Sequence, residues 1–269
     1  MDGSSRGALL TSRNALEQAL AQGSTADLAE ELFFVGRTLD GSAALRRSLS
    51  DPSRPAVSRQ GLVDRLFEGK VSDTAREIVR KATGQRWSAE RDMADAIDLL
   101  GAEAVLAHAE SEGRIEQVEH DLFILGQAVR DSPTLRDALA DRRRSGEDKS
   151  ALVSKLLEGK ATPEAQRLAA LAAHNPRGQR FDQAVQRYAD VAARRREQLV
   201  AIVTSARALA DDDAQRLTQV LSKNYGKQVQ LNVLVDPELV GGLRVQIGDD
   251  IIDGSVSGRL EEARRAMAG

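Results

Sequence analysis

Cysteine is absent from the 269-residue chain, which excludes disulfides and thiolate metal sites and is compatible with a reducing compartment. Aromatic residues make up only 3% of the sequence, so a core must be built mainly from Leu, Val, Ile and Ala, as helical bundles allow. An excess of positive charge is also missing, because the formal net charge is −3. Nucleic-acid binding normally needs such an excess for its phosphate contacts, and we therefore expect no nucleic-acid partner.

Long hydrophobic runs are absent as well. No run approaches the roughly 18–20 apolar residues that a membrane-spanning helix needs. Residues 1–6 lack the basic start and the apolar stretch of a signal peptide. Hydrophobic residues make up 41% of the chain and charged residues 29%, which is a globular balance. We expect any membrane association to come only through partners.

Apolar residues recur at helical spacing through most of the first 196 residues. Leu28, Leu32, Val35 and Leu39, for example, occupy one face of an amphipathic helix. Residues 93–117 show a nearly continuous helical pattern. This part of the chain is therefore predicted to be helical.

The helical part repeats itself after a shift of ninety residues. The matching pairs include Leu32 with Leu122, Phe33 with Phe123, Gly36 with Gly126, Leu45 with Leu135, Leu49 with Leu139, Leu62 with Leu152 and Gly69 with Gly159. After a slip of four residues, Trp87 matches Phe181. A period of this length is too long for a solenoid repeat and indicates a duplicated domain. We expect two tandem six-helix bundles, over residues 1–100 and 101–196, that share a helix or closely abut.

Strand patterns are confined to the last part of the chain. The expected strands cover residues 199–203, 229–235, 243–247 and 251–252. A helix is expected from Asp211, and a final helix after Ser255. The fold predicted for the whole chain is mainly α, with the two bundles followed by a small α/β domain over residues 197–269.

Three short motifs in this last part agree in residue type and spacing with a known family. They are Val-Asp-x-x-Leu-Val-Gly-Gly at 235–242, Val-x-Ile-Gly-Asp at 245–249, and Ile-Asp-Gly-Ser at 252–255 followed by Gly258-Arg259-Leu260. In these motifs the chain resembles the δ subunit of F-type ATP synthases, called the oligomycin-sensitivity-conferring protein in mitochondria. A δ subunit is a six-helix bundle followed by a small α/β domain, which residues 101–269 match in length and order. Residues 1–100 are additional, and this long form resembles the actinobacterial variety.

The resemblance implies a function in the peripheral stalk, or stator, of a proton-translocating ATP synthase. In the family, the N-terminal bundle binds N-terminal helices of the α subunits in the catalytic head, and the C-terminal domain binds the membrane-anchored b subunits. Rotation is thereby coupled to ATP synthesis, without any catalytic group on the δ subunit. The implied location is peripheral, at the cytoplasmic face of the bacterial cell membrane.

Apolar positions are the candidates for these partner-binding surfaces. They are Leu9, Leu10 and Leu16 in the first bundle, their counterparts Leu99, Leu100 and Leu106 in the second, and Val256, Leu260 and Met267 in the final helix. A groove lined by such residues would suit an amphipathic helix. Packing in the core is the competing interpretation for each of them.

No set of residues has the spacing of a catalytic, cofactor or metal site. The three histidines are scattered, without a second ligand at metal spacing. Asp249, Asp250 and Asp253 could ligate magnesium, although a hairpin turn and a helix cap explain them equally well. We therefore predict no catalytic residue, no cofactor and no metal.

Two other functions fit parts of the sequence. A helical adaptor that binds coiled coils outside ATP synthase would have the same bundles, but would leave the motifs at 235–260 unexplained. A metal-dependent enzyme would use the acidic residues at 249–253 and would require converging carboxylates.

Overall fold

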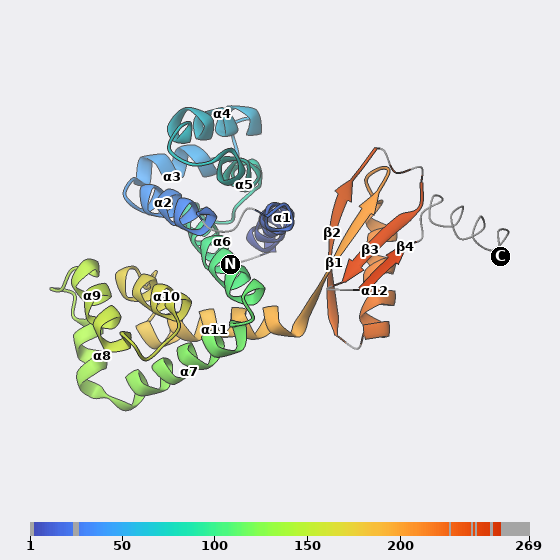
Figure 1. Cartoon of the computed structure of the whole chain (residues 1–269). Helices are drawn as coiled ribbons and strands as arrows, with labels where there is room; N and C mark the ends of the chain where they lie inside the picture. The colour runs from blue at the N-terminus through green and yellow to red at the C-terminus, as the bar shows by residue number, and fades with distance from the viewer. Residues whose placement is uncertain are drawn as a thin grey trace. The chain divides into compact units, whose positions relative to one another are not determined.

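The computed structural model describes residues 3–23, 27–225, 227–237, 239, 241–247 and 250–253. Within them the chain forms twelve helices and four strands (Figure 1). The prediction of a mainly helical chain with a small C-terminal sheet is thus confirmed. The chain divides into two compact units, residues 1–196, which we call the helical unit, and residues 197–269, the C-terminal unit.

The helical unit contains eleven helices in the described residues. They are α1 (Gly3–Ala21), α2 (Leu28–Asp40), α3 (Ala43–Ser50), α4 (Ala56–Phe67), α5 (Asp73–Gly84), α6 (Glu90–Ser111), α7 (Ile115–Asp131), α8 (Pro133–Ala140), α9 (Gly146–Leu157), α10 (Pro163–His174) and α11 (Phe181–Glu197).

Several helix ends lie where the sequence chemistry favours them. Ser72 accepts a hydrogen bond from the backbone N–H three residues later at 3.2 Å, and Thr162 does the same at 3.4 Å. Gly69 and Gly159 follow the ends of α4 and α9 with φ angles of 69° and 68°, in the left-handed region that favours glycine. The same caps therefore occur ninety residues apart.

Helix α6 is the central helix of this unit. Every residue from Ala96 to Ala107 is buried, so the helix is covered on all sides. One hydrophobic cluster extends from Ala8 to Ala192 and includes α6. The boundary predicted between residues 100 and 101 falls within this helix, and the division into two bundles stays a prediction.

The prediction of a nearly continuous helix over residues 93–117 is wrong at 112–114. Gly113 has a φ of 69°, and the N–H of Arg114 reaches back to the carbonyl of Ala109 at 2.7 Å. This hydrogen bond satisfies a carbonyl at the end of α6, as in other helices that finish on a left-handed glycine. Helix α7 then starts afresh at Ile115.

The C-terminal unit is a four-stranded sheet with one helix in the described residues. Its elements are β1 (Gln198–Ser205), α12 (Asp211–Tyr225), β2 (Gln228–Val235), β3 (Leu243–Ile247) and β4 (Asp250–Asp253). The strand order is β2-β1-β3-β4, and β1 and β2 run parallel because α12 crosses between them. The other pairs are antiparallel. The expected final helix lies outside the described residues.

A separate small core joins the sheet to α12. Ala201, Val203, Val245 and Ile247 lie on the same face of neighbouring strands and cluster with Leu221 of the helix. The period of two along each strand places their polar neighbours on the other face. None of the helices in the described part of the chain is long and apolar enough to cross a membrane.

Candidate partner-docking surfaces

The predicted leucines of the helical unit differ in accessibility. Leu10 is 59% exposed on α1, whereas Leu9 is half-buried. Leu16, which is also on α1, is buried. The three counterparts on α6, Leu99, Leu100 and Leu106, are buried as well. Of these six positions, only Leu10 presents most of its side chain to a partner.

Helix α2 packs closely against α6 and helps to cover it. Phe33 of α2 is completely buried, and its ring lies so close to Gly101 that a Cβ added there would be 2.6 Å from Phe33 Cε1. Gly36 of α2 lies equally close to α6, since a Cβ added to it would be 2.8 Å from a carboxylate oxygen of Asp98. Two glycines, one on each helix, thus permit this close packing.

Charged side chains join α2 to α10 at the same place. Arg167 of α10 stacks over Phe33, with its guanidinium carbon 5.1 Å from the ring centroid. The same guanidinium donates two hydrogen bonds of 2.6 Å to the carboxylate of Glu30. Planar guanidinium and carboxylate groups favour this two-point geometry. The contact joins residues of the first hundred to residues of the second.

Arg177 forms the largest ion cluster of the unit. Its guanidinium lies 2.8 Å from Asp40, 2.5 Å from Asp95 and 2.9 Å from Asp98, and the arginine side chain is only 8% exposed. Burial raises the pKa of Asp98 against the lowering effect of Arg177. Burial also disfavours the charge on Arg177, but the surrounding carboxylates raise the pKa of its guanidinium overall. Arg177 therefore connects α2, α6 and the loop before α11.

A second set of ion pairs connects α1 to α6 and α11. Arg195 of α11 lies 2.7 Å from Glu17 of α1 and 2.5 Å from Glu110 of α6. Burial opposes the charge on Arg195, yet the two carboxylates raise its pKa. Arg13 of α1 pairs with Glu103 of α6 at 2.5 Å, and burial raises the pKa of Glu103. We call these contacts, together with those of Arg167 and Arg177, the seam.

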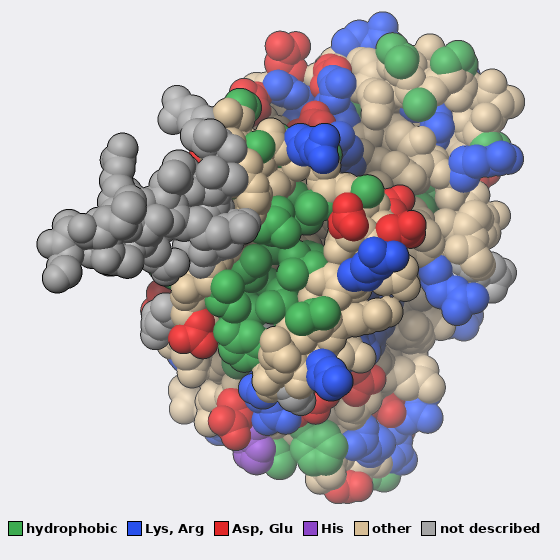
Figure 2. All heavy atoms as spheres, turned by 90° about the vertical axis from the view of Figure 1, so that its right-hand side faces the viewer, with side chains coloured by type: hydrophobic (Ala, Val, Ile, Leu, Met, Phe, Trp, Pro, Cys, Tyr) green, Lys and Arg blue, Asp and Glu red, His purple; other side chains and the backbone are tan. Residues whose placement is uncertain are grey.

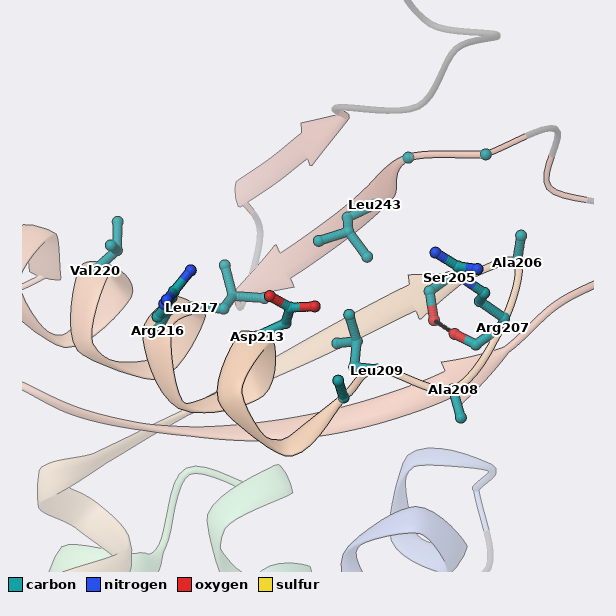
Figure 3. A pocket seen from close by; sticks show the side chains of 13 residues that line it. Ser205, Ala206, Arg207, Ala208, Leu209, Asp213, Arg216, Leu217, Val220 and Leu243 are labelled. Carbon is teal, nitrogen blue, oxygen red and sulfur yellow. Dashed lines mark hydrogen bonds between the residues drawn. The ribbon is translucent and has the colours of Figure 1, made fainter.

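The C-terminal unit contains a cavity of about 830 Å³ beside α12. Figure 3 shows Leu209, Leu217 and Leu243 directed into the space between α12 and the strands. Charged side chains border it, with Asp213 and Arg216 on α12. The residues lining it are Ser205, Ala206, Arg207, Ala208, Leu209, Ala210, Asp213, Arg216, Leu217, Val220, Gly241, Gly242 and Leu243.

Backbone hydrogen bonds and glycine conformations shape the segments that line this cavity. The hydroxyl of Ser205 donates to the carbonyl of Arg207 at 2.7 Å, and the N–H of Asp236 donates to the carbonyl of Ser205 at 2.8 Å. Gly241 and Gly242 have φ angles of 111° and 85°, which other residues rarely adopt. The paired glycines of the sequence motif thus form part of the rim.

Apolar side chains of the C-terminal unit also reach the surface. Val220 of α12 is 55% exposed, and Val235, Ile251 and Ile252 are similarly accessible. Figure 2 shows, on the face turned to the viewer, a band of hydrophobic side chains bordered by charged ones. An apolar surface with a charged border suits an amphipathic partner. The predicted residues Val256, Leu260 and Met267 lie outside the described residues.

No cluster of three or more His, Cys, Asp or Glu residues that could hold a metal occurs among the described residues. Asp250 accepts a hydrogen bond from the hydroxyl of Tyr225 at 3.3 Å. Asp249 lies outside the described residues.

Comparisons with known proteins identify the family of this chain. The family model described as "ATP synthase delta (OSCP) subunit" matches residues 102–267. The chain belongs to this ATP synthase delta (OSCP) family. It is therefore a peripheral-stalk subunit of an F-type ATP synthase and not itself catalytic, as the resemblance predicted.

Similar δ subunits share the long form of the chain. "ATP synthase subunit delta" of Kineococcus radiotolerans is 46% identical over 89% of this chain and 87% of the relative. The δ subunit of Beutenbergia cavernae is 42% identical over the whole of both chains, and that of Streptomyces avermitilis is 41% identical over 99% and 98%. The additional residues 1–100 are thus shared with these relatives.

Among solved structures, a chain of the mitochondrial ATP synthase hexamer of Toxoplasma gondii is 19% identical, over 62% of this chain and 95% of its own. Its TM-score of 0.30 is too low to indicate a shared fold.

The sequence patterns of this δ subunit do not predict the seam. The signal that could have found it is an acid within an apolar run, such as Asp98 between Ile97 and Leu99, or Glu103 among alanines. A carboxylate in a helix buried on all sides needs a partner. The partners Arg177 and Arg195 could not be identified by spacing, because they lie 79 and 178 residues from Asp98 and Glu17 respectively.

Proposed function

We propose that this δ subunit links the catalytic head to the membrane part of the enzyme through one helical partner at each unit. The helical unit binds N-terminal helices of the α subunits, and the C-terminal unit binds the b subunits. The seam is the observation that supports this proposal, because it joins residues 1–100 to residues 101–196 by buried ion pairs. A stator resists torque, and a stiff helical unit is suited to that.

The proposed surface for the α subunit is the outer side of helix α1, around Leu9 and Leu10. The equivalent leucines on α6 are buried, partly because α2 packs on that helix. Binding of the α-subunit helix to α6 would first require α2 to move away from α6, which would expose the buried side chain of Phe33. Leu10 needs no such rearrangement, since it is already accessible.

Substitutions test this surface in the intact chain, since a truncation at residue 101 would cut α6. A synthetic N-terminal helix of the α subunit is titrated against Leu10→Asp and, as control, Val57→Asp. Val57 is also a highly exposed apolar residue, but lies on α4. We expect Leu10→Asp to weaken binding about tenfold or more and Val57→Asp to leave it unchanged. Equal binding by both variants would rule out α1 as the docking surface.

The proposed surface for the b subunits is the cavity beside α12 with its exposed Val220. Its apolar floor and charged rim could accept one face of an amphipathic helix. Val256, Leu260 and Met267 remain candidates for the same interaction. The test measures affinity for a peptide from the end of b, using Val220→Asp and the neighbouring Gln219→Asp as control. Gln219 is exposed on α12 but does not line the cavity, so only Val220→Asp should weaken binding.

We also propose that residues 1–100 and 101–196 are two copies of one bundle, followed by the α/β domain at 197–269. Helices α3, α4 and α5 have 8, 12 and 12 residues, and α8, α9 and α10 have the same lengths. Helix α6 would be the last helix of the first copy and the first helix of the second. This sharing accounts for eleven helices in place of twelve.

Binding to b would place the chain at the cytoplasmic face of the bacterial cell membrane. The chain would then sediment with membranes that contain b and stay in the supernatant with membranes that lack it. Retention on membranes without b would contradict an attachment through that partner.

A further inference from the structure

A second cavity, of about 710 Å³, lies in the helical unit away from helix α1. It is formed by the end of α7, helix α8, the start of α9 and the loop that leads into α11 (Figure 1). Its lining residues are Val129, Arg136, Asp137, Leu139, Ala140, Arg142, Lys149, Pro176, Gly178, Gln179, Arg180, Phe181 and Asp182. Ligand sites commonly have volumes of about 300–1,000 Å³.

The floor of this cavity is apolar. Val129, Leu139 and Phe181 come from three different helices and are each at least 93% removed from solvent, with exposures of 2%, 7% and 7%. They belong to the hydrophobic cluster of the unit. The floor is thus part of the hydrophobic core.

The rim carries four cationic side chains and two carboxylates, although the chain as a whole is acidic. Arg180 is paired with Asp182 at 3.0 Å, and Arg136 donates to the backbone carbonyl of Arg130. Arg142 and Lys149 have no ion pair with any described residue. Only Asp137 opposes them, so the cavity has an excess of positive charge.

The first half of the unit shows how protein side chains occupy the matching place. Lys149 corresponds to Arg59 in the ninety-residue repeat, and Phe181 corresponds to Trp87. Arg59 is 4% exposed and donates to the carbonyls of Thr83 and Gln85 at 2.6 and 3.0 Å. The second half has a shorter lysine and a smaller ring at these positions. Both replacements remove volume where the cavity lies.

We infer that this cavity binds an acidic, apolar segment of a partner protein. An apolar side chain of the segment would pack on Val129, Leu139 and Phe181, while a carboxylate would face Arg142 and Lys149. The cavity offers an apolar floor and an excess of cationic side chains together, which suits a segment that carries both an apolar side chain and a carboxylate. The site is distinct from α1 and from the cavity of the C-terminal unit, and so goes beyond the function proposed above.

The test uses the full chain and a fluorescently labelled synthetic helix composed of Leu, Ala and Glu. We expect its anisotropy to rise on binding and the affinity to fall with added salt, because the rim charges are screened. The double variant Arg142→Gln/Lys149→Gln should bind about tenfold more weakly. The matched control is Arg144→Gln/Lys155→Gln, which removes two nearby cations that do not line the cavity. It should bind like the wild type.

A second variant, Ala140→Trp, fills the cavity without altering charge. Ala140 is exposed on α8, so the substitution is compatible with folding, and it should weaken binding about tenfold or more. The inference is overturned if the cavity variants bind as well as the controls, or if a peptide with Lys in place of Glu binds equally. Binding of anilinonaphthalene sulfonate at the cavity without binding of the acidic peptide would also overturn it, by indicating a site for small anions.

Discussion

Replacing Arg177 by Met tests whether the seam holds the helical unit together. Methionine keeps an unbranched apolar stem but lacks the guanidinium, and so leaves Asp40, Asp95 and Asp98 without their shared cation. The side chain of Asp98 is only 4% exposed. Removing one partner of a buried ion pair costs about 3–5 kcal/mol, since the other charge stays buried. For a unit of this size, that corresponds to a loss of about 6–20 °C in Tm.

The loss depends on pH through Asp98. Its pKa is raised in the folded state, so its contribution to stability is fully present below the unfolded pKa and disappears as pH rises through the folded pKa. Arg177 lowers that pKa, and Arg177→Met therefore raises it further. The destabilisation caused by the substitution should be larger at about pH 8 than at about pH 5.

Trp87 provides a local assay. It is the only tryptophan of the chain and is buried in the helical unit, so its fluorescence during urea unfolding reports on that unit alone. Arg196→Met is the control, because Arg196 is 41% exposed and 3.4 Å from Glu119, a pair worth about 0–1 kcal/mol. The double variant Arg177→Met/Asp98→Asn removes the orphaned charge and should recover part of the loss. A loss below about 1 kcal/mol for Arg177→Met, or no recovery in the double variant, would refute the reasoning.

Two further predictions concern packing and caps. Gly101→Ala should destabilise the unit by about 1–3 kcal/mol, because its Cβ would clash with the buried ring of Phe33. Gly7→Ala, at a helical position with open space, should instead stabilise it by about 0.5–1 kcal/mol, and both are measured by urea unfolding. Ser72→Ala and Thr162→Ala should each cost about 1 kcal/mol in the same assay, since both remove an N-cap. If one of the two cap variants left the free energy of unfolding unchanged, the matching caps in the two halves would not contribute equally to stability.

Local chemistry in the sequence was sufficient for most elements. The strands at 229–235 and 243–247 agree with β2 and β3 to within a residue, because alternation and bounding Pro and Gly are local signals. The start of α12 at Asp211 was predicted from an equally local signal, the acidic residues that favour a helix start. The family motifs, which lie in this last part of the chain, then identified the function.

Contacts between distant elements were not predictable in this way. Gly36 and Gly101 lie within helices, where glycine is locally unfavourable, and only their tertiary neighbours show why glycine is needed. The break at Gly113 was missed because helix-favouring Ala and Glu residues precede it. Arg177 has a φ of 53°, unusual for a residue other than glycine, and no local pattern predicts it. The two cavities are likewise formed where ends of several elements meet.

The positions of the ion pairs favour a mechanical role over a purely stabilising one. Exposed ion pairs contribute little, and buried ones can be replaced by apolar residues without loss of stability. What buried pairs do provide is a specific geometry, since Arg177 and Arg195 each have carboxylates on other helices at fixed positions. An apolar seam of equal strength could slide, whereas these pairs resist relative movement because each displacement leaves a charge without its partner. For a stalk subunit under torque, resistance to sliding matters more than the free energy of unfolding.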